Sequence, residues 1–135
     1  MKAGQLICFL EGQLPGEELE VQITEELRSW RRALSERGCS AHIHLDNASP
    51  HFQVTVAQVR RLLLATLDGS FSRTAAAYLV DALLLGDPFA IDDESLRDVL
   101  DGLSENQVGG CLQEEDIREA LASMPGVSPR LYWGP

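Results

Sequence analysis

Apolar residues recur with the period of an α-helix in the first third of the chain. They follow one another at steps of four, four, three and four: Leu19, Ile23, Leu27, Trp30 and Leu34. This spacing places all of them on one face of a helix. Pro15 and Gly16 break the chain before the segment, and Gly38 is the kind of residue that follows a helix end. The pattern predicts a helix over residues 17–37.

Two more helices are predicted over residues 55–68 and 72–85. Thr55 followed by Gln58 forms a capping-box pattern at the start of the first of them. The second is apolar nearly all round, with Asp81 as the one charge in its last eleven residues. A helix of this kind is usually the buried, central one of a fold.

An internal repeat follows, in which residues 91–103 match residues 112–124 without a gap. Each unit begins with an apolar residue, continues through acids and an arginine, and ends in apolar residues. The repeat predicts two short amphipathic helices, over 92–103 and 113–123. The residues expected at their caps are Asp92 and Gln113. Two units are too few for a solenoid and indicate an αα-hairpin laid on the helical core.

The remaining segments carry weaker patterns. Alternating apolar residues near 41–56 fit either a small β-hairpin or an ordered loop. The short apolar run 6–10 fits a helical turn or a strand equally well. The tail 125–135 cannot continue a helix, and its Tyr132 and Trp133 either pack back onto the helices or serve as interface anchors. The predicted fold is mostly α, a single compact domain of about five helices over residues 1–135.

Size and composition support one soluble domain. A chain of 135 residues with 44% hydrophobic residues can bury a core without a metal or disulfide. No apolar run approaches the length of a membrane span, and the first residues do not resemble a signal peptide. The three cysteines, an odd number at wide spacing, indicate reduced thiols. These features predict a cytoplasmic protein.

Negative charge is concentrated in the repeat region. The chain has a net charge of −10, and residues 87–119 hold eleven acids against Arg97 and Arg118, a local net charge of −9. The favourable interaction of acids with helix N-termini accounts for only some of these eleven residues. The acids either form a solvated face or a docking surface for a basic protein. The predicted contact residues are Asp92, Asp93, Glu94, Asp98, Asp101, Glu114, Glu115, Asp116 and Glu119.

The same charge argues against nucleic acid and membrane surfaces as partners. Arg28, Arg31, Arg32 and Arg37 form a basic stripe, but they are expected to pair internally, as with Glu25 or Glu36, or to suit a helix C-terminus. The sequence leaves open whether the chain forms a homo-oligomer.

Catalytic and metal-binding signatures are incomplete. The acidic region lacks the ligand spacing of a calcium-binding EF-hand loop. All three histidines, His42, His44 and His51, lie near Cys39 and Asp46, but their spacing is not that of a structural zinc site. A thiol at a helix C-terminus is also not activated. We therefore expect no cofactor, no metal and no enzymatic activity; a metal-dependent or thiol enzyme at Cys39, His42 and His44 is the lesser alternative.

In size, acidity and helical pattern the chain resembles the small acidic immunity proteins with which bacteria neutralise their own toxins. The resemblance rests on the acidic units at 92–94 and 114–116. It implies a one-to-one complex with a basic toxin, often a nuclease, whose active site the acidic surface would cover. A regulatory adaptor that binds a basic helix or tail is the alternative.

Overall fold

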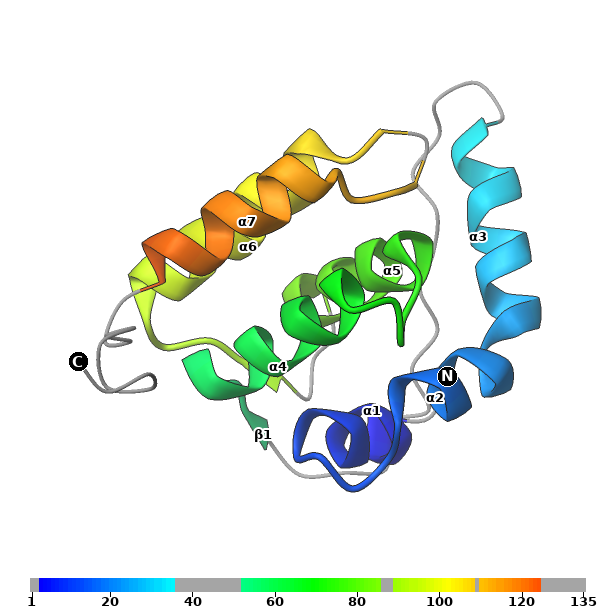
Figure 1. The fold of residues 1–135 in the computed structure, drawn as a ribbon, viewed down its shortest axis with the longest axis horizontal. Coiled ribbons are helices and arrows are strands. Elements are labelled where there is room, and N and C mark those ends of the chain that lie inside the picture. Colours follow the sequence, from blue (N-terminus) through cyan, green and yellow to red (C-terminus); the bar gives the residue numbers. More distant parts are fainter. Residues whose placement is uncertain (1–2, 36–51, 86–88, 109, 125–135) are drawn as a thin grey trace.

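The helix at residues 73–85 is the centre around which the other elements pack. In the computed structural model, which describes residues 3–35, 52–85, 89–108 and 110–124, seven helices and two short strands are present. Their bounds are α1 (Ala3–Leu10), α2 (Gly16–Gln22), α3 (Thr24–Ser35), β1 (Phe52–Gln53), α4 (Val56–Leu67), α5 (Arg73–Leu85), β2 (Phe89–Ala90), α6 (Glu94–Asn106) and α7 (Glu114–Ser123). The predicted fold class, a compact and mostly α domain, is confirmed (Figure 1).

Helix α5 is buried because it is apolar on all its faces. Its buried residues are Ala75, Ala76, Ala77, Tyr78, Leu79, Val80, Ala82 and Leu83. Helices α3, α4 and α6 all pack against it, and α7 packs on α4. The consecutive small alanines near its start allow neighbouring helices to approach closely. The sequence-based prediction of a central, buried helix is therefore confirmed.

The predicted starts of α4 and α5 are confirmed by their hydrogen bonds. The Thr55 hydroxyl accepts from the Gln58 backbone N–H at 3.3 Å, and the Gln58 side chain accepts from the Thr55 N–H at 3.0 Å. This is the reciprocal capping box. The Ser72 hydroxyl accepts from the Ala75 N–H at 3.0 Å and caps α5 in the same way.

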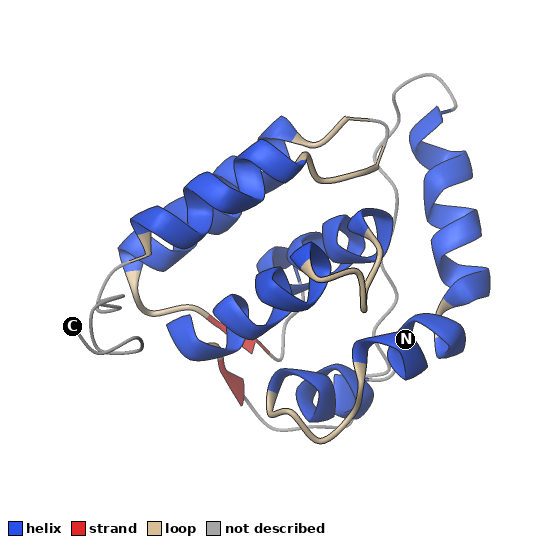
Figure 2. Cartoon of the chain, viewed as in Figure 1, coloured by secondary structure: helices blue, strands red, loops and turns tan. Residues whose placement is uncertain are grey.

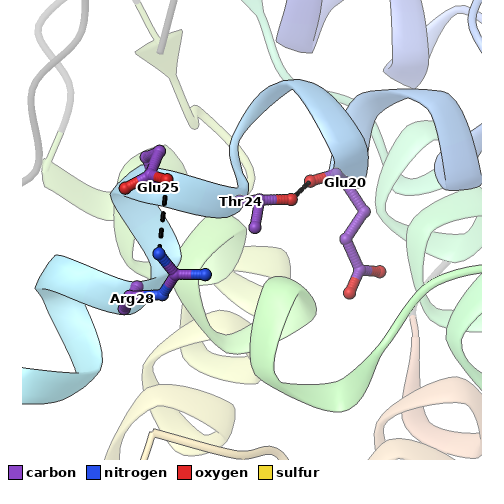
Figure 3. Close-up of polar contacts among 4 residues, drawn as sticks. All are labelled: Glu20, Thr24, Glu25 and Arg28. Atoms are coloured by element: carbon purple, nitrogen blue, oxygen red, sulfur yellow. Dashed lines mark hydrogen bonds and ion pairs between the residues drawn. The ribbon is translucent and has the colours of Figure 1, made fainter.

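The single helix predicted over residues 17–37 is wrong, because the chain forms α2 and α3 with a break at Ile23. The Ile23 N–H is shared between the carbonyls of Leu19 and Glu20. The Thr24 hydroxyl donates to the Glu20 carbonyl at 2.9 Å (Figure 3). A threonine that bonds back one turn in this way bends a helix. The apolar spacing stays helical through the bend, so periodicity alone does not reveal it; residues 36 and 37 lie outside the described residues.

A small parallel sheet includes the end of the segment 41–56, for which the sequence left a β-hairpin or an ordered loop open. Strand β1 lies within that segment, but it pairs in parallel with β2, with Phe52 opposite Phe89 and Gln53 opposite Ala90 (Figure 2). Parallel strands require a long crossover connection, so this pair is no hairpin. Residues 41–51 lie outside the described residues.

The apolar run at residues 6–10, which fitted either a helix or a strand, belongs to α1. Leu6, Phe9 and Leu10 are buried in the core. Phe9 stacks on Phe71 with ring centroids 5.1 Å apart, which joins α1 to the loop before α5. No helix among the described residues is both long and apolar enough to cross a membrane.

Gly16, at the start of α2, lies against the stacked pair of Phe9 and Phe71. A Cβ atom there would stand 3.2 to 3.3 Å from both rings, closer than ordinary packing allows. We expect Gly16→Ala to lower the free energy of unfolding by about 1–3 kcal/mol through overpacking. Thermal or urea denaturation measures this.

The matched control is Gly4→Ala in α1, where a Cβ would meet nothing within 4 Å. Alanine there replaces a helical glycine and should leave stability unchanged or raise it by about 0.5–1 kcal/mol. Equal effects of the two substitutions would contradict the packing role of Gly16.

Candidate functional site

The acidic repeat forms the αα-hairpin that the sequence predicts. Helices α6 and α7 pack side by side and run in opposite directions along one flank of the molecule (Figure 1). Leu96, Leu100 and Leu103 of α6 and Ile117 and Ala120 of α7 are buried. The acids therefore lie on the outer faces of the two helices.

The cap of α6 differs by one residue from the prediction. Asp93 rather than Asp92 is the N-cap, and its carboxylate accepts from the Leu96 N–H at 3.1 Å. Helix α7 does begin after Gln113, whose side chain makes no capping bond and donates instead to the Cys111 carbonyl. Aspartate is among the favoured N-cap residues, and Asp93 is the aspartate that stands three residues before the N–H it caps.

The acidic clusters at equivalent positions of the two repeat units lie apart, because α6 and α7 are antiparallel. Asp93 and Glu94 lie at the start of α6, whereas Glu114 and Glu115 lie at the start of α7, beside the end of α6. Since α6 has 13 residues, the clusters lie roughly 18 Å apart along the hairpin. The structure therefore does not bring all nine predicted contact residues together.

A groove of about 490 Å³ runs along the outer seam between α6 and α7. Three of the predicted contact residues line it: Asp98, Asp116 and Glu119. Leu103 and Ala120, both buried, form its apolar floor. The other lining residues are Val99, Gly102, Asn106, Ala122 and Ser123. The hairpin thus presents an apolar channel with carboxylates from both helices along it.

Gly102 is a groove residue that the charge pattern does not single out. It lies inside α6, where glycine is about 1 kcal/mol less favourable than alanine. A Cβ added to it would meet no heavy atom within 4 Å. Packing of the chain on itself therefore does not require glycine here. The available signal in the sequence is a glycine within an otherwise regular amphipathic helix.

Few of the hairpin acids are neutralised within the chain. Glu114 pairs with Arg118 at 3.0 Å, and both side chains are more than half exposed, so water weakens the pair. Asp98, Asp101, Asp116 and Glu119 make no side-chain ion pair or hydrogen bond with any other described residue. The groove therefore carries uncompensated negative charge.

Asp81 of α5 positions the hairpin on the core. Its carboxylate accepts from the Ser104 hydroxyl at 2.6 Å and from the Gln107 side-chain nitrogen at 3.3 Å. Burial raises the pKa of Asp81, and the two hydrogen bonds from α6 lower it by less. A polar contact in the apolar interface of α5 and α6 fixes how the two helices align, because misalignment would leave the carboxylate without donors.

Most residues of the alternative metal or thiol site lie outside the described part of the chain. Cys39, His42, His44 and His51, with Asp46, all lie in the segment 36–51. The other two cysteines, Cys8 and Cys111, are free and partly buried. Within the described part of the chain, no group of three histidine, cysteine or acidic side chains is arranged to hold a metal ion. Tyr132 and Trp133 of the tail also lie outside it.

No protein-family model, curated protein or solved structure matches this chain.

The raised pKa of Asp81 predicts a specific pH dependence of stability. The folded state holds this proton more tightly than the unfolded state, whose carboxyl has the ordinary pKa of 3.8. Its stabilising contribution is therefore present below that value and is lost as the pH rises through the folded-state pKa. Asp81→Asn keeps an acceptor for Ser104 and Gln107 without the charge. As the pH rises from about 3 to about 7, we expect the free energy of unfolding of Asp81→Asn to increase relative to that of the wild type.

Urea denaturation across this pH range measures the difference. Asp101→Asn is the control, because it makes the same change at an exposed position of α6. Parallel profiles for Asp81→Asn and the wild type would show that burial does not perturb Asp81.

Proposed function

We propose that this chain is a protein–protein interaction module that binds a basic partner in the groove between α6 and α7. The observation that carries the proposal is the combination of an apolar floor with carboxylates from both helices that have no partners among the described residues. A solvated face requires charge but no concave apolar channel. A docking site uses both, since the floor supplies affinity and the charges supply orientation and partner choice.

The occupant that fits this groove best is a basic amphipathic helix. The seam between two antiparallel helices is straight, and a third helix can lie along it as in other helix-in-groove complexes. Its apolar stripe would contact Leu103 and Ala120, and lysines or arginines on its two sides would reach Asp98 on α6 and Asp116 and Glu119 on α7. Gly102 would let the partner backbone approach α6 closely.

The cellular role that we propose is that of an immunity protein in the bacterial cytoplasm. A toxin that acts on nucleic acid has a basic active site, and an acidic groove is complementary to such a surface. Long-range attraction between the two would speed association and make it sensitive to salt. A regulatory adaptor would use the same groove for a basic helix of a non-toxic protein, and the identity of the captured partner separates the two roles.

Charge reversal in the groove tests the site. We expect the triple substitution Asp98→Lys, Asp116→Lys and Glu119→Lys to slow association with the partner by about 10–100-fold at low salt. A low-salt pull-down identifies the bound protein by mass, and surface plasmon resonance then measures its rate constants. Toxicity of that protein when expressed alone supports the immunity role.

The matched control reverses three exposed acids away from the hairpin: Glu11, Glu17 and Glu18. It changes the net charge by the same amount. If both triple variants slow association equally, overall charge rather than the groove governs binding. If the groove variant binds the partner as well as the wild type does, the groove is not the binding site.

Gly102→Leu separates binding from folding. Leucine is a better helix former than glycine, so the variant should be as stable as the wild type or more stable by about 0.5–1 kcal/mol. The added side chain would occupy the groove and weaken partner binding by at least about ten-fold. Denaturation and the same binding assay measure the two effects.

Gly4→Leu is the control, because that helical position also has open space around its Cβ and lies on α1. Tight binding by Gly102→Leu would show that the partner does not enter the groove.

A further inference from the structure

Positive charge gathers in a second concave surface, between α3 and the start of α5. This cleft has a volume of about 700 Å³. Its lining residues are Arg28, Arg31, Arg32, Glu20, Thr24, Leu27, Ser72 and Thr74. Three arginines against one acid are a local exception in a chain with a net charge of −10. Helix α3, which forms one wall of the cleft, and the acidic hairpin lie on different sides of α5 (Figure 1).

Helix periodicity explains how α3 presents this wall. Thr24, Arg28 and Arg31 follow at steps of four and three, so they form one stripe of the helix. Leu27 and Trp30 lie on the neighbouring stripe and are buried. The basic stripe therefore borders the contact between α3 and the core, beside the first turn of α5.

Contacts to α5 hold α3 in place. Trp30 meets the edge of the Tyr78 ring at a centroid distance of 5.4 Å. The Tyr78 hydroxyl donates to the Glu26 carboxylate at 2.8 Å. Burial, together with this carboxylate, raises the pKa of Tyr78, so the hydroxyl stays protonated and remains a donor. The two walls are thus fixed relative to one another by side chains that are not part of the cleft.

Two of the cleft arginines, Arg28 and Arg31, are not held in buried ion pairs with other described residues. Arg28 pairs with Glu25 at 3.3 Å, as the sequence led us to expect, but both side chains are largely exposed and such pairs contribute little (Figure 3). Arg31 has no ion-pair partner among the described residues. The Glu20 carboxylate accepts from the Ser72 N–H at 2.8 Å, so it is engaged at the start of α5.

We propose that this cleft binds the phosphate group of a small phosphate monoester. Arginine guanidinium groups match the oxygen geometry of phosphate and bind it through paired hydrogen bonds. The hydroxyls of Ser72 and Thr74 provide further donors from the opposite wall. A phosphate presents more acceptor oxygens than a carboxylate and suits this number of donors. The cleft volume lies within the range of small-ligand pockets and leaves room for an organic group beside the phosphate.

The test is an NMR titration of the full chain with inorganic phosphate and, separately, with glycerol phosphate at constant ionic strength. We expect saturable chemical-shift changes confined to the backbone amides of α3 and residues 72–74, with half-saturation at about 1 mM of the added phosphate compound. Arg31→Gln should raise that concentration at least about ten-fold, because a charge-assisted phosphate contact is lost. Arg97→Gln, the same change on α6, should leave it unaltered.

The outcomes separate the ligand sources. Tighter binding of glycerol phosphate than of inorganic phosphate supports a phosphate monoester as the ligand, and equal binding would overturn the monoester and leave inorganic phosphate. Shifts that grow linearly without saturation, equal effects of Arg31→Gln and Arg97→Gln, or equal binding of acetate would overturn the proposal. The triple groove variant should bind phosphate like the wild type, so this result does not depend on the role of the hairpin.

Discussion

A helix that is apolar nearly all round has to be covered nearly all round, and this requirement of α5 organises the fold. Removing apolar surface from water is the main favourable contribution to folding, roughly 25 cal/mol for each Å². With α3, α4 and α6 packed around it, most of α5 is inaccessible to solvent. The helices that cover it need only one apolar face each, which leaves their other faces for charged residues.

Two polar side chains of α5 determine how its neighbours are oriented. Tyr78 bonds to Glu26 on α3, and Asp81 bonds to Ser104 and Gln107 on α6. Hydrophobic contact alone tolerates sliding and rotation of helices, whereas a polar group in an apolar interface is satisfied in few arrangements. One contact positions the arginine wall of the cleft, and the other positions the groove. Both candidate sites therefore depend on the same central helix.

The distribution of charge follows from the way the chain is folded over this centre. Helix α3, which carries the arginines, lies on one side of α5, and the acidic hairpin α6–α7 lies on another (Figure 1). The salt bridges of Glu25 with Arg28 and of Glu114 with Arg118 each join close neighbours within one helix and do not connect the two regions.

Local patterns in the sequence were sufficient for α4, α5, α6 and α7, because helix formation and capping depend on residues three and four apart. The Thr55 capping box, the buried character of residues 73–85 and the helical repeat are all of this kind. Local patterns did not reveal the bend at Ile23, since a threonine hydroxyl and a backbone carbonyl produce it without interrupting the apolar spacing. Nor did they show the pairing of β1 with β2, which joins strands 37 residues apart.

The sequence by itself determined the concentration of acids in the repeat and their exposure on amphipathic helices. Only the tertiary structure decided which acids come together, because that depends on the direction in which α7 returns along α6. An antiparallel return places Asp98, Asp116 and Glu119 along one groove with Gly102, and it carries Asp93 and Glu94 away from Glu114 and Glu115. The packing of α3 against α5 separately forms a cleft from an arginine stripe and a distant helix start. Such sites join residues that are remote in sequence, and their geometry is set by the packing of helices, which local periodicity does not encode.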